Sequence, residues 1–107
     1  MIVPVHMLAF EEPERIRQVD IPDVDAKACK GDEDLLELVF YYGQNDFQPK
    51  PCCSVSVGDV ARLKGEYWLV APVGWIHLTL EELEAHRAVP RQDRSLNAYK
   101  IARAHNV

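Results

Sequence analysis

Two prolines, Pro49 and Pro51, most constrain how this chain can fold, because they separate a helix-like pattern from a strand-like one. Proline lacks the backbone donor that a helix needs, and it pushes the preceding residue towards extended backbone. A single helix therefore cannot run through this stretch. The order of patterns around it predicts an α+β fold, with a small antiparallel sheet, one main packed helix and one or two short C-terminal helices.

The main helix is expected over residues 32–42. Asp32 can cap its N-terminus, and the acidic side chains of Glu33 and Asp34 complement the helix dipole in the first turn. Gly43 follows at a position where helices often end. Apolar side chains at helical spacing predict one stripe along this helix. The stripe consists of Leu35, Leu36, Val39, Phe40 and Tyr42.

The N-terminal part of the chain predicts two extended segments. Residues 2–8 are rich in Val and Ile and form the first segment, in which Pro4 favours an edge position. A turn at residues 11–15 leads to the second segment, which ends before Pro22. Residues 22–31 are then expected to form a polar, acidic loop.

The part of the chain after the prolines predicts a meander of short strands between residues 54 and 78. Val55 and Val57 alternate with serines at its start, and Lys64-Gly65 has the character of a tight hairpin turn. The sequence leaves open which alternation of side chains points inward. Candidates for the inner face are Leu63, Tyr67, Leu69 and Trp75.

Helical patterns return at the C-terminal end. Thr79 and Glu82 have the spacing of a capping box, which predicts a short helix through about residue 87, before Pro90. A final helix is expected over residues 93–105. One side of it would carry Leu96, Tyr99 and either Ala102 or Arg103.

A chain of 107 residues has room for one domain. We therefore expect residues 1–107 to form a single domain, in which the basic helical tail, residues 88–107, could be semi-independent. No apolar run approaches the roughly 20 residues that a membrane span needs, so no membrane partner is expected. Three cysteines cannot complete a disulfide framework, and reduced thiols in a cytoplasmic protein are the expectation.

The charge is unevenly distributed along the sequence. The net charge is −5, with a balance of −7 over residues 1–59 and +2 over residues 60–107. Such an acidic region can be a solvated face that aids solubility, or it can attract a basic protein surface. The acidic face expected to bind a partner consists of Asp20, Asp23, Asp25, Asp32, Glu33, Asp34 and Glu37.

The basic C-terminal tail supports an alternative function, because Lys and Arg side chains can contact phosphates. The whole chain is acidic, with a pI near 5.3, whereas a typical nucleic-acid-binding domain carries a strongly basic patch. Direct nucleic-acid binding is therefore kept as the second hypothesis. Its contacts would be Arg87, Arg91, Arg94, Lys100 and Arg103.

The sequence contains no motif that commits it to catalysis. The histidines are scattered singly and no CxxC or HxxxH spacing occurs, so we expect no metal, no cofactor and no catalytic residues. The adjacent thiols of Cys52 and Cys53, with His77 as a base, are the one conceivable nucleophilic arrangement. A cysteine-dependent enzyme is therefore kept as the last alternative.

Aromatic side chains offer candidate anchors for an interface. On an alternating strand, Tyr67 and Trp68 point to opposite faces, so one of them is a candidate for exposure, and Trp75 is a third candidate. The alternative interpretation is a second small core under the C-terminal helix.

The stretch from residue 35 to residue 78 resembles the YodL-like group of small domains from phages, plasmids and integrative mobile elements. In that group a helix ending near Asn is followed by an SxSVxDV segment, a short hairpin and an xVGF segment. Trp75 stands where an aromatic such as Phe is usual, and residues 1–31 and 79–107 lie outside the match. The matching residues are Asn45, Ser54, Ser56, Val57, Asp59, Val60, Gly65, Tyr67, Val70, Val73, Gly74 and Trp75.

The resemblance implies an accessory module of a mobile element and transfers no catalytic residue. It gives structural roles to Asn45, Ser54, Ser56, Gly58, Asp59 and Gly74, including a Gly58-Asp59 bend in which the aspartate bonds nearby backbone N–H groups. Combined with the charge asymmetry, it leads to one main expectation. The chain is expected to be a non-enzymatic, anti-defence inhibitor, such as an anti-CRISPR protein, whose acidic face occupies a basic nucleic-acid groove on a host complex.

Overall fold

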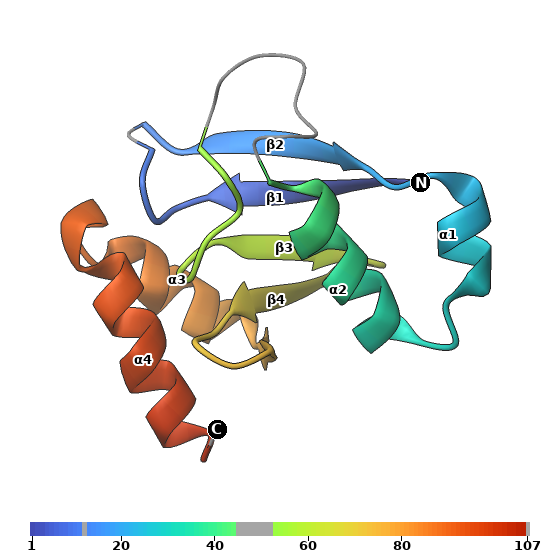
Figure 1. The fold of residues 1–107 in the computed structure, drawn as a ribbon. Coiled ribbons are helices and arrows are strands. Elements are labelled where there is room, and N and C mark those ends of the chain that lie inside the picture. Colours follow the sequence, from blue (N-terminus) through green and yellow to red (C-terminus); the bar gives the residue numbers. More distant parts are fainter. Residues whose placement is uncertain (12, 45–52, 107) are drawn as a thin grey trace.

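The computed structural model describes residues 1–11, 13–44 and 53–106, and its strands form one antiparallel sheet (Figure 1). The strand order β2-β1-β3-β4-β5 places β2 and β5 at the two edges. Each neighbouring pair is antiparallel. The strands are β1 (Ile2–Met7), β2 (Arg15–Asp20), β3 (Val60–Leu63), β4 (Glu66–Val70) and β5 (Trp75–Leu78).

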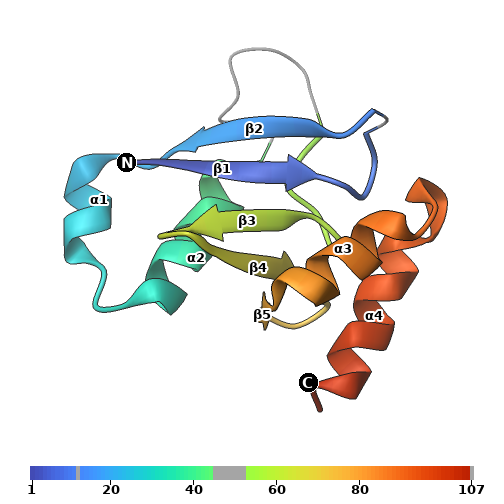
Figure 2. The same cartoon turned by 180° about the vertical axis from the view of Figure 1, so that it is seen from behind.

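Helices cover both faces of this sheet. One face carries α2, with α1 beside it, and the opposite face carries α3 and α4 (Figures 1 and 2). The helices are α1 (Asp23–Ala28), α2 (Asp32–Tyr42), α3 (Leu80–Ala88) and α4 (Arg94–Ala104), with a short 3₁₀ turn, η2 (Arg91–Asp93), before α4. The predicted α+β class is confirmed.

The alternation of strand side chains divides the interior into two cores. Beneath α2, the first core contains Val5 of β1 and Leu63 of β3, with Leu36 of the helix. Beneath α3 and α4, the second core contains Leu69 of β4 and Ala98 of α4. Because side chains alternate along a strand, one short meander can supply both cores. Leu63 and Leu69 therefore do not share the single inner face that the sequence suggested.

The hairpin and capping predictions are confirmed. Lys64 and Gly65 both have positive φ, at 53° and 80°, in the turn between β3 and β4. The Thr79 side chain accepts a hydrogen bond from the Glu82 backbone N–H, and the Glu82 side chain accepts one from the Thr79 N–H. Gly43 lies at the C-cap of α2, where a Cβ would come 2.4 Å from the Val55 side chain. The glycine therefore allows the segment that leads to β3 to pass close to the end of the helix.

The expected loop at residues 22–31 is wrong, because residues Asp23–Ala28 form the short helix α1. Pro22 stands at its N-cap, and Asp23 and Asp25 lie in its first turn. Acidic side chains in the first turn are an ordinary signal for a helix start. A six-residue helix is too short to show the periodicity on which the sequence argument depended.

The expected edge position of Pro4 is also wrong. β1 lies between β2 and β3 in the sheet. Its register with β3, however, covers only Val5 and His6. Proline is tolerated in this inner strand because Pro4 lies outside that two-residue ladder.

The start and the exposed side of α2 differ from the prediction. Gly31 occupies the N-cap and no side chain caps the helix, while Asp32 forms an ion pair with Lys64, with 2.8 Å between Oδ1 and Nζ. Of the predicted apolar stripe, the side chains of Leu35, Leu36 and Val39 are buried. Phe40 of the predicted stripe is exposed instead.

Two further predictions need correction. Ser54 to Val57 do not form a strand, because β3 begins only at Val60. In α4 the buried residues are Ala98 and Ala102, while the predicted side chains Leu96 and Tyr99 are exposed. Small side chains let α4 approach the second core closely, which the larger ones would prevent. None of the helices in the described part of the chain is long and apolar enough to cross a membrane.

Candidate functional site

The exposed side of α2 carries the acidic ridge, which we define as Glu33, Asp34 and Glu37. Since Leu35, Leu36 and Val39 turn towards the first core, these three carboxylates face solvent. Glu33 and Glu37 are four residues apart and therefore lie on the same side of the helix, where like charges repel.

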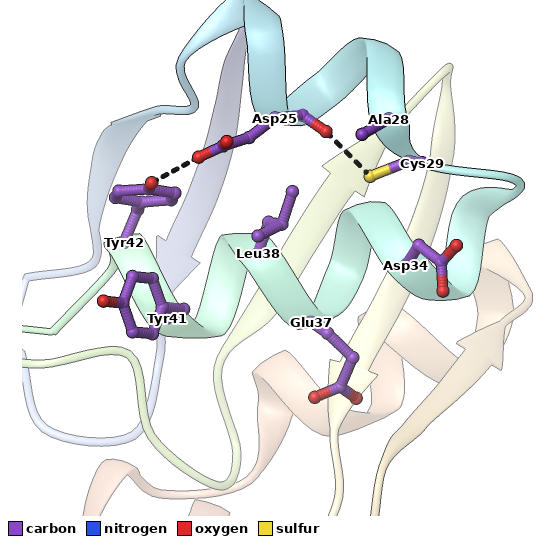
Figure 3. A pocket seen from close by; sticks show the side chains of 8 residues that line it. All are labelled: Asp25, Ala28, Cys29, Asp34, Glu37, Leu38, Tyr41 and Tyr42. Carbon is purple, nitrogen blue, oxygen red and sulfur yellow. Dashed lines mark hydrogen bonds between the residues drawn. The ribbon is translucent and has the colours of Figure 1, made fainter.

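A hollow of about 490 Å³ lies on one side of the ridge, between α1 and α2 (Figure 3). We call it the α1–α2 hollow. Asp25 of α1 accepts a hydrogen bond from the Tyr42 hydroxyl of α2, and this bond raises the pKa of that hydroxyl. Tyr41 packs edge-on against Tyr42, with 4.9 Å between ring centroids. The hollow is lined by Asp25, Ala28, Cys29, Asp34, Glu37, Leu38, Tyr41 and Tyr42.

The thiol in this hollow is not activated. Cys29 Sγ lies 3.4 Å from the Asp25 carbonyl oxygen, to which it donates. Burial, followed by the negative charges of Asp34 and Asp25, raises the pKa of this thiol. A protonated thiol is a poor nucleophile, so the α1–α2 hollow has an acidic and aromatic lining without a reactive group.

A second hollow lies on the other side of the ridge, between α2 and the strands β4 and β5. Its volume is about 370 Å³, and we call it the tryptophan groove. Trp68 stacks on His77 of β5, with 4.8 Å between ring centroids. The groove is lined by Glu33, Asp34, Leu36, Glu37, Trp68, Val73, Gly74 and Trp75.

An adjoining apolar hollow continues the tryptophan groove towards the C-terminal end of α2. Its volume is about 210 Å³. Glu37, Gly74 and Trp75 line both spaces, so they form the boundary between them. The remaining lining of the apolar hollow is Phe40, Val57, Val70, Ala71 and Pro72.

The predicted acidic residues divide into two groups in the structure. Asp25, Glu33, Asp34 and Glu37 line the hollows beside α2. Asp32 is held by Lys64, while Asp20 and Asp23 lie near the Met1 nitrogen, at 3.9 Å and 3.0 Å. Among the described residues, the three hollows beside α2 have no Lys, Arg or His in their lining. The negative potential of the acidic face is therefore concentrated around α2.

The predicted aromatic anchors also separate. Trp68 and Trp75 belong to the first core and the tryptophan groove. Tyr67 packs against the second core instead, with the Arg62 guanidinium 5.9 Å from its ring centroid. Tyr67 and Trp68 do lie on opposite faces, but both are half-buried.

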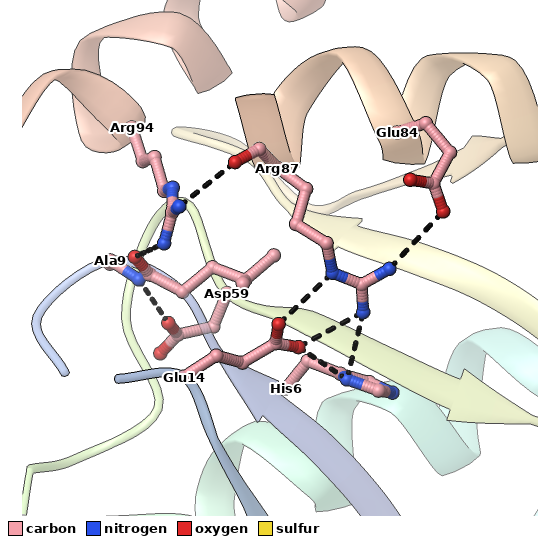
Figure 4. A network of polar contacts seen from close by, with 8 residues as sticks. His6, Ala9, Glu14, Asp59, Glu84, Arg87 and Arg94 are labelled. Atoms are coloured by element: carbon pink, nitrogen blue, oxygen red, sulfur yellow. Dashed lines mark hydrogen bonds and ion pairs between the residues drawn. The ribbon is translucent and has the colours of Figure 1, made fainter. Parts of the chain in front are cut away.

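Two of the predicted phosphate-binding arginines are occupied within the protein (Figure 4). Arg87 donates to both carboxylate oxygens of Glu14, at 3.0 and 2.9 Å. Arg94 donates to the carbonyl oxygens of Leu8, Arg87 and Val89. Lys100 and Arg103 remain exposed on α4, and Arg91 is half-buried in η2. The basic tail therefore offers a weaker cationic surface than its sequence suggested.

The polar network around Arg87 has a structural role. His6 Nδ1 lies 2.7 Å from Glu14. Burial opposes ionisation of Glu14, but the hydrogen bonds from Arg87 and His6 prevail and hold its pKa below the usual value. This network joins β1 and the turn before β2 to α3.

His86 connects α3 to the bend before β3 and to α4. It is fully buried, and burial lowers the pKa of its imidazole. A neutral ring satisfies both contacts: Nε2–H donates to the Gly58 carbonyl oxygen at 2.8 Å, and Nδ1 accepts from the Asn97 amide at 2.9 Å. With both nitrogens engaged, His86 has no free position for acid–base chemistry.

The residues of the sequence motif form tight backbone turns. Asp59 accepts hydrogen bonds from the backbone N–H groups of Ala9 and Ser56, each at 2.8 Å, as the predicted bend requires. Gly58 and Gly74 have positive φ, at 104° and 72°. The Ser56 hydroxyl donates to the Ser54 carbonyl oxygen. Asn45 lies outside the described residues.

The described residues do not bring a cysteine and a histidine together as a nucleophile and its base. Cys52 lies outside the described residues, and Cys53 packs against the first core. His77 bonds to Glu66 at 2.7 Å and stacks on Trp68. No hydrogen bond between described residues joins Cys53 to a histidine, and no metal-binding cluster of three or more His, Cys, Asp or Glu occurs in that part of the chain.

No protein-family model, curated protein or solved structure matches the chain. The geometry of α2 and its flanking hollows therefore has to carry the functional argument. Sequence analysis identified the acidic residues and both tryptophans separately, but it missed that one helix and one strand pair bring them together.

Proposed function

We propose that this chain is a non-enzymatic protein-binding module whose acidic ridge on α2 docks against a basic, nucleic-acid-binding surface of another protein. The YodL-like resemblance suggests that the module serves a mobile genetic element. In that setting, covering a basic groove would inhibit a host defence complex, as an anti-CRISPR protein does.

One observation carries the proposal: exposed carboxylates lie beside concave, aromatic-lined surfaces, and among the described residues no Lys, Arg or His belongs to that lining. Asp32 has Lys64 as its partner, whereas Glu33 and Glu37 have no ion pair with any described residue. Hollows of about 490 and 370 Å³ flank these carboxylates. Acidic charge complements a basic partner and speeds association, and aromatic side chains often supply the affinity.

Affinity capture from a bacterial lysate, with two matched charge reversals, tests the proposal. Glu33 and Glu81 each occupy the second position of their helix and are exposed, but α2 and α3 cover opposite faces of the sheet. Glu33→Lys and Glu81→Lys therefore change net charge and helix-dipole energy alike. We expect wild type and Glu81→Lys to retain a nucleic-acid-binding protein that added DNA releases, and Glu33→Lys to lose it.

Capture should be carried out at about 50 mM and about 150 mM salt, because exposed charge interactions are screened. Equal retention by the two variants would remove α2 as the interface. Recovery of no DNA-releasable protein at either salt concentration would contradict the proposed function itself.

A further inference from the structure

The tryptophan groove brings both tryptophans of the chain next to the carboxylates of the acidic ridge. The chain has only two tryptophans, Trp68 and Trp75, and both line this groove. Three carboxylates of the acidic ridge form the wall opposite, on α2. Indole rings attract cations over their faces, and carboxylates attract them electrostatically.

Among the described residues, no basic side chain lines the carboxylate wall of the tryptophan groove. Glu33 and Glu37 repel each other across one turn of α2. Two basic side chains of the neighbouring strands and turn are engaged elsewhere, since Lys64 forms an ion pair with Asp32 and His77 lies 2.7 Å from Glu66. A cation placed between the ridge and the indoles would reduce this repulsion.

We propose that the tryptophan groove binds an arginine side chain of the partner, presented on an extended peptide segment. This inference rests on the proposed docking of a basic protein and specifies the side chain that is recognised. A guanidinium is planar, stacks on aromatic rings and donates five hydrogen bonds in a fixed fork. Lysine has a compact, strongly hydrated ammonium that stacks on an aromatic ring less well.

The apolar hollow next to the groove indicates which side chain of the peptide would lie beside the arginine. Gly74 separates the two spaces, and no atom lies within 4 Å of the position that a Cβ would occupy there. Space is therefore open beside Gly74, a residue that the two hollows share. Phe40, Val57 and Pro72 line the apolar hollow, which suits an apolar side chain close to the arginine.

Binding of two peptides with equal charge tests the inference. Nona-arginine and nona-lysine should be titrated into the full chain while its tryptophan fluorescence is recorded. Both tryptophans line the groove, so the emission reports on binding there. We expect nona-arginine to bind about tenfold more tightly than nona-lysine, and to change the emission more at saturation.

Substitutions in the groove separate stacking from charge attraction. Trp75→Leu should remove the preference for arginine while leaving the nona-lysine affinity nearly unchanged, and Trp75→Phe should keep most of the preference. The double variant Glu33→Gln, Glu37→Gln should weaken the binding of both peptides. Because these side chains are exposed, the variant should still fold. Circular dichroism checks the fold of each variant.

The possible results distinguish the two proposals. Equal affinity for both peptides, still reduced by the glutamine substitutions, would overturn arginine recognition and keep acidic docking. Trp68 already stacks on His77, so the inference assigns the guanidinium to Trp75. An arginine preference that persists in a folded Trp75→Leu variant would therefore overturn the inference. Failure of both peptides to bind would overturn arginine recognition and docking together.

Discussion

At the scale of single residues, Asp59 connects protonation to the fold. The residue is 1% exposed, and its carboxylate accepts hydrogen bonds from the backbone N–H groups of Ala9 and Ser56. Burial raises its pKa to about 6, against the lowering effect of these two hydrogen bonds. Nearby Glu11 raises the pKa further, while Arg17 lowers it.

This pKa predicts a pH dependence of stability. A carboxyl with a raised pKa stabilises the folded state fully below its unfolded pKa, near 4, and loses that contribution as pH rises through about 6. The contribution lost is ~3 kcal/mol, because each pKa unit corresponds to about 1.4 kcal/mol. Urea unfolding of wild type and Asp59→Asn at about pH 4 and about pH 7 measures it.

The difference between the two proteins isolates Asp59 from the other titrating groups. Wild type should lose stability relative to Asp59→Asn as the pH rises across this range. A constant difference between the two unfolding free energies would show that Asp59 has an ordinary pKa.

At the scale of elements, the start of α3 depends on a local capping box. The Thr79 hydroxyl oxygen accepts the Glu82 N–H at 3.1 Å, and Glu82 accepts the Thr79 N–H at 3.0 Å. Thr79→Ala should lower the free energy of unfolding by about 1 kcal/mol, whereas Thr79→Ser should keep most of it. Urea denaturation checks this, and equal midpoints for the alanine variant and wild type would contradict the capping role.

Elements determined by local chemistry could be predicted, and elements determined by distant packing could not. The capping box and the Lys64-Gly65 turn follow from adjacent residues. The burial of Ala98 in place of Leu96 follows from how closely α4 approaches the sheet, which no local pattern reveals. The same reason applies to the candidate site. Its acidic side chains were visible in the sequence, but the groove forms only when α2 packs beside β4 and β5.

At the scale of the whole molecule, the two helical layers give the sheet two different surroundings. The layer formed by α1 and α2 carries the acidic ridge and the hollows beside it. The layer formed by α3 and α4 uses Arg87, Arg94 and His86 for internal contacts. Arg87 and Arg94 therefore contribute to holding the fold, while Glu33 and Glu37 remain exposed on α2.

The central claim is that a basic partner docks on the acidic ridge of α2, and one calorimetric comparison tests it most directly. Nona-arginine is titrated into wild type, Glu33→Lys and Glu81→Lys at the same salt concentration. The account predicts that Glu33→Lys weakens binding about tenfold or more, while Glu81→Lys stays within about twofold of wild type. Equal weakening by the two reversals would show that only net charge matters and would contradict the claim.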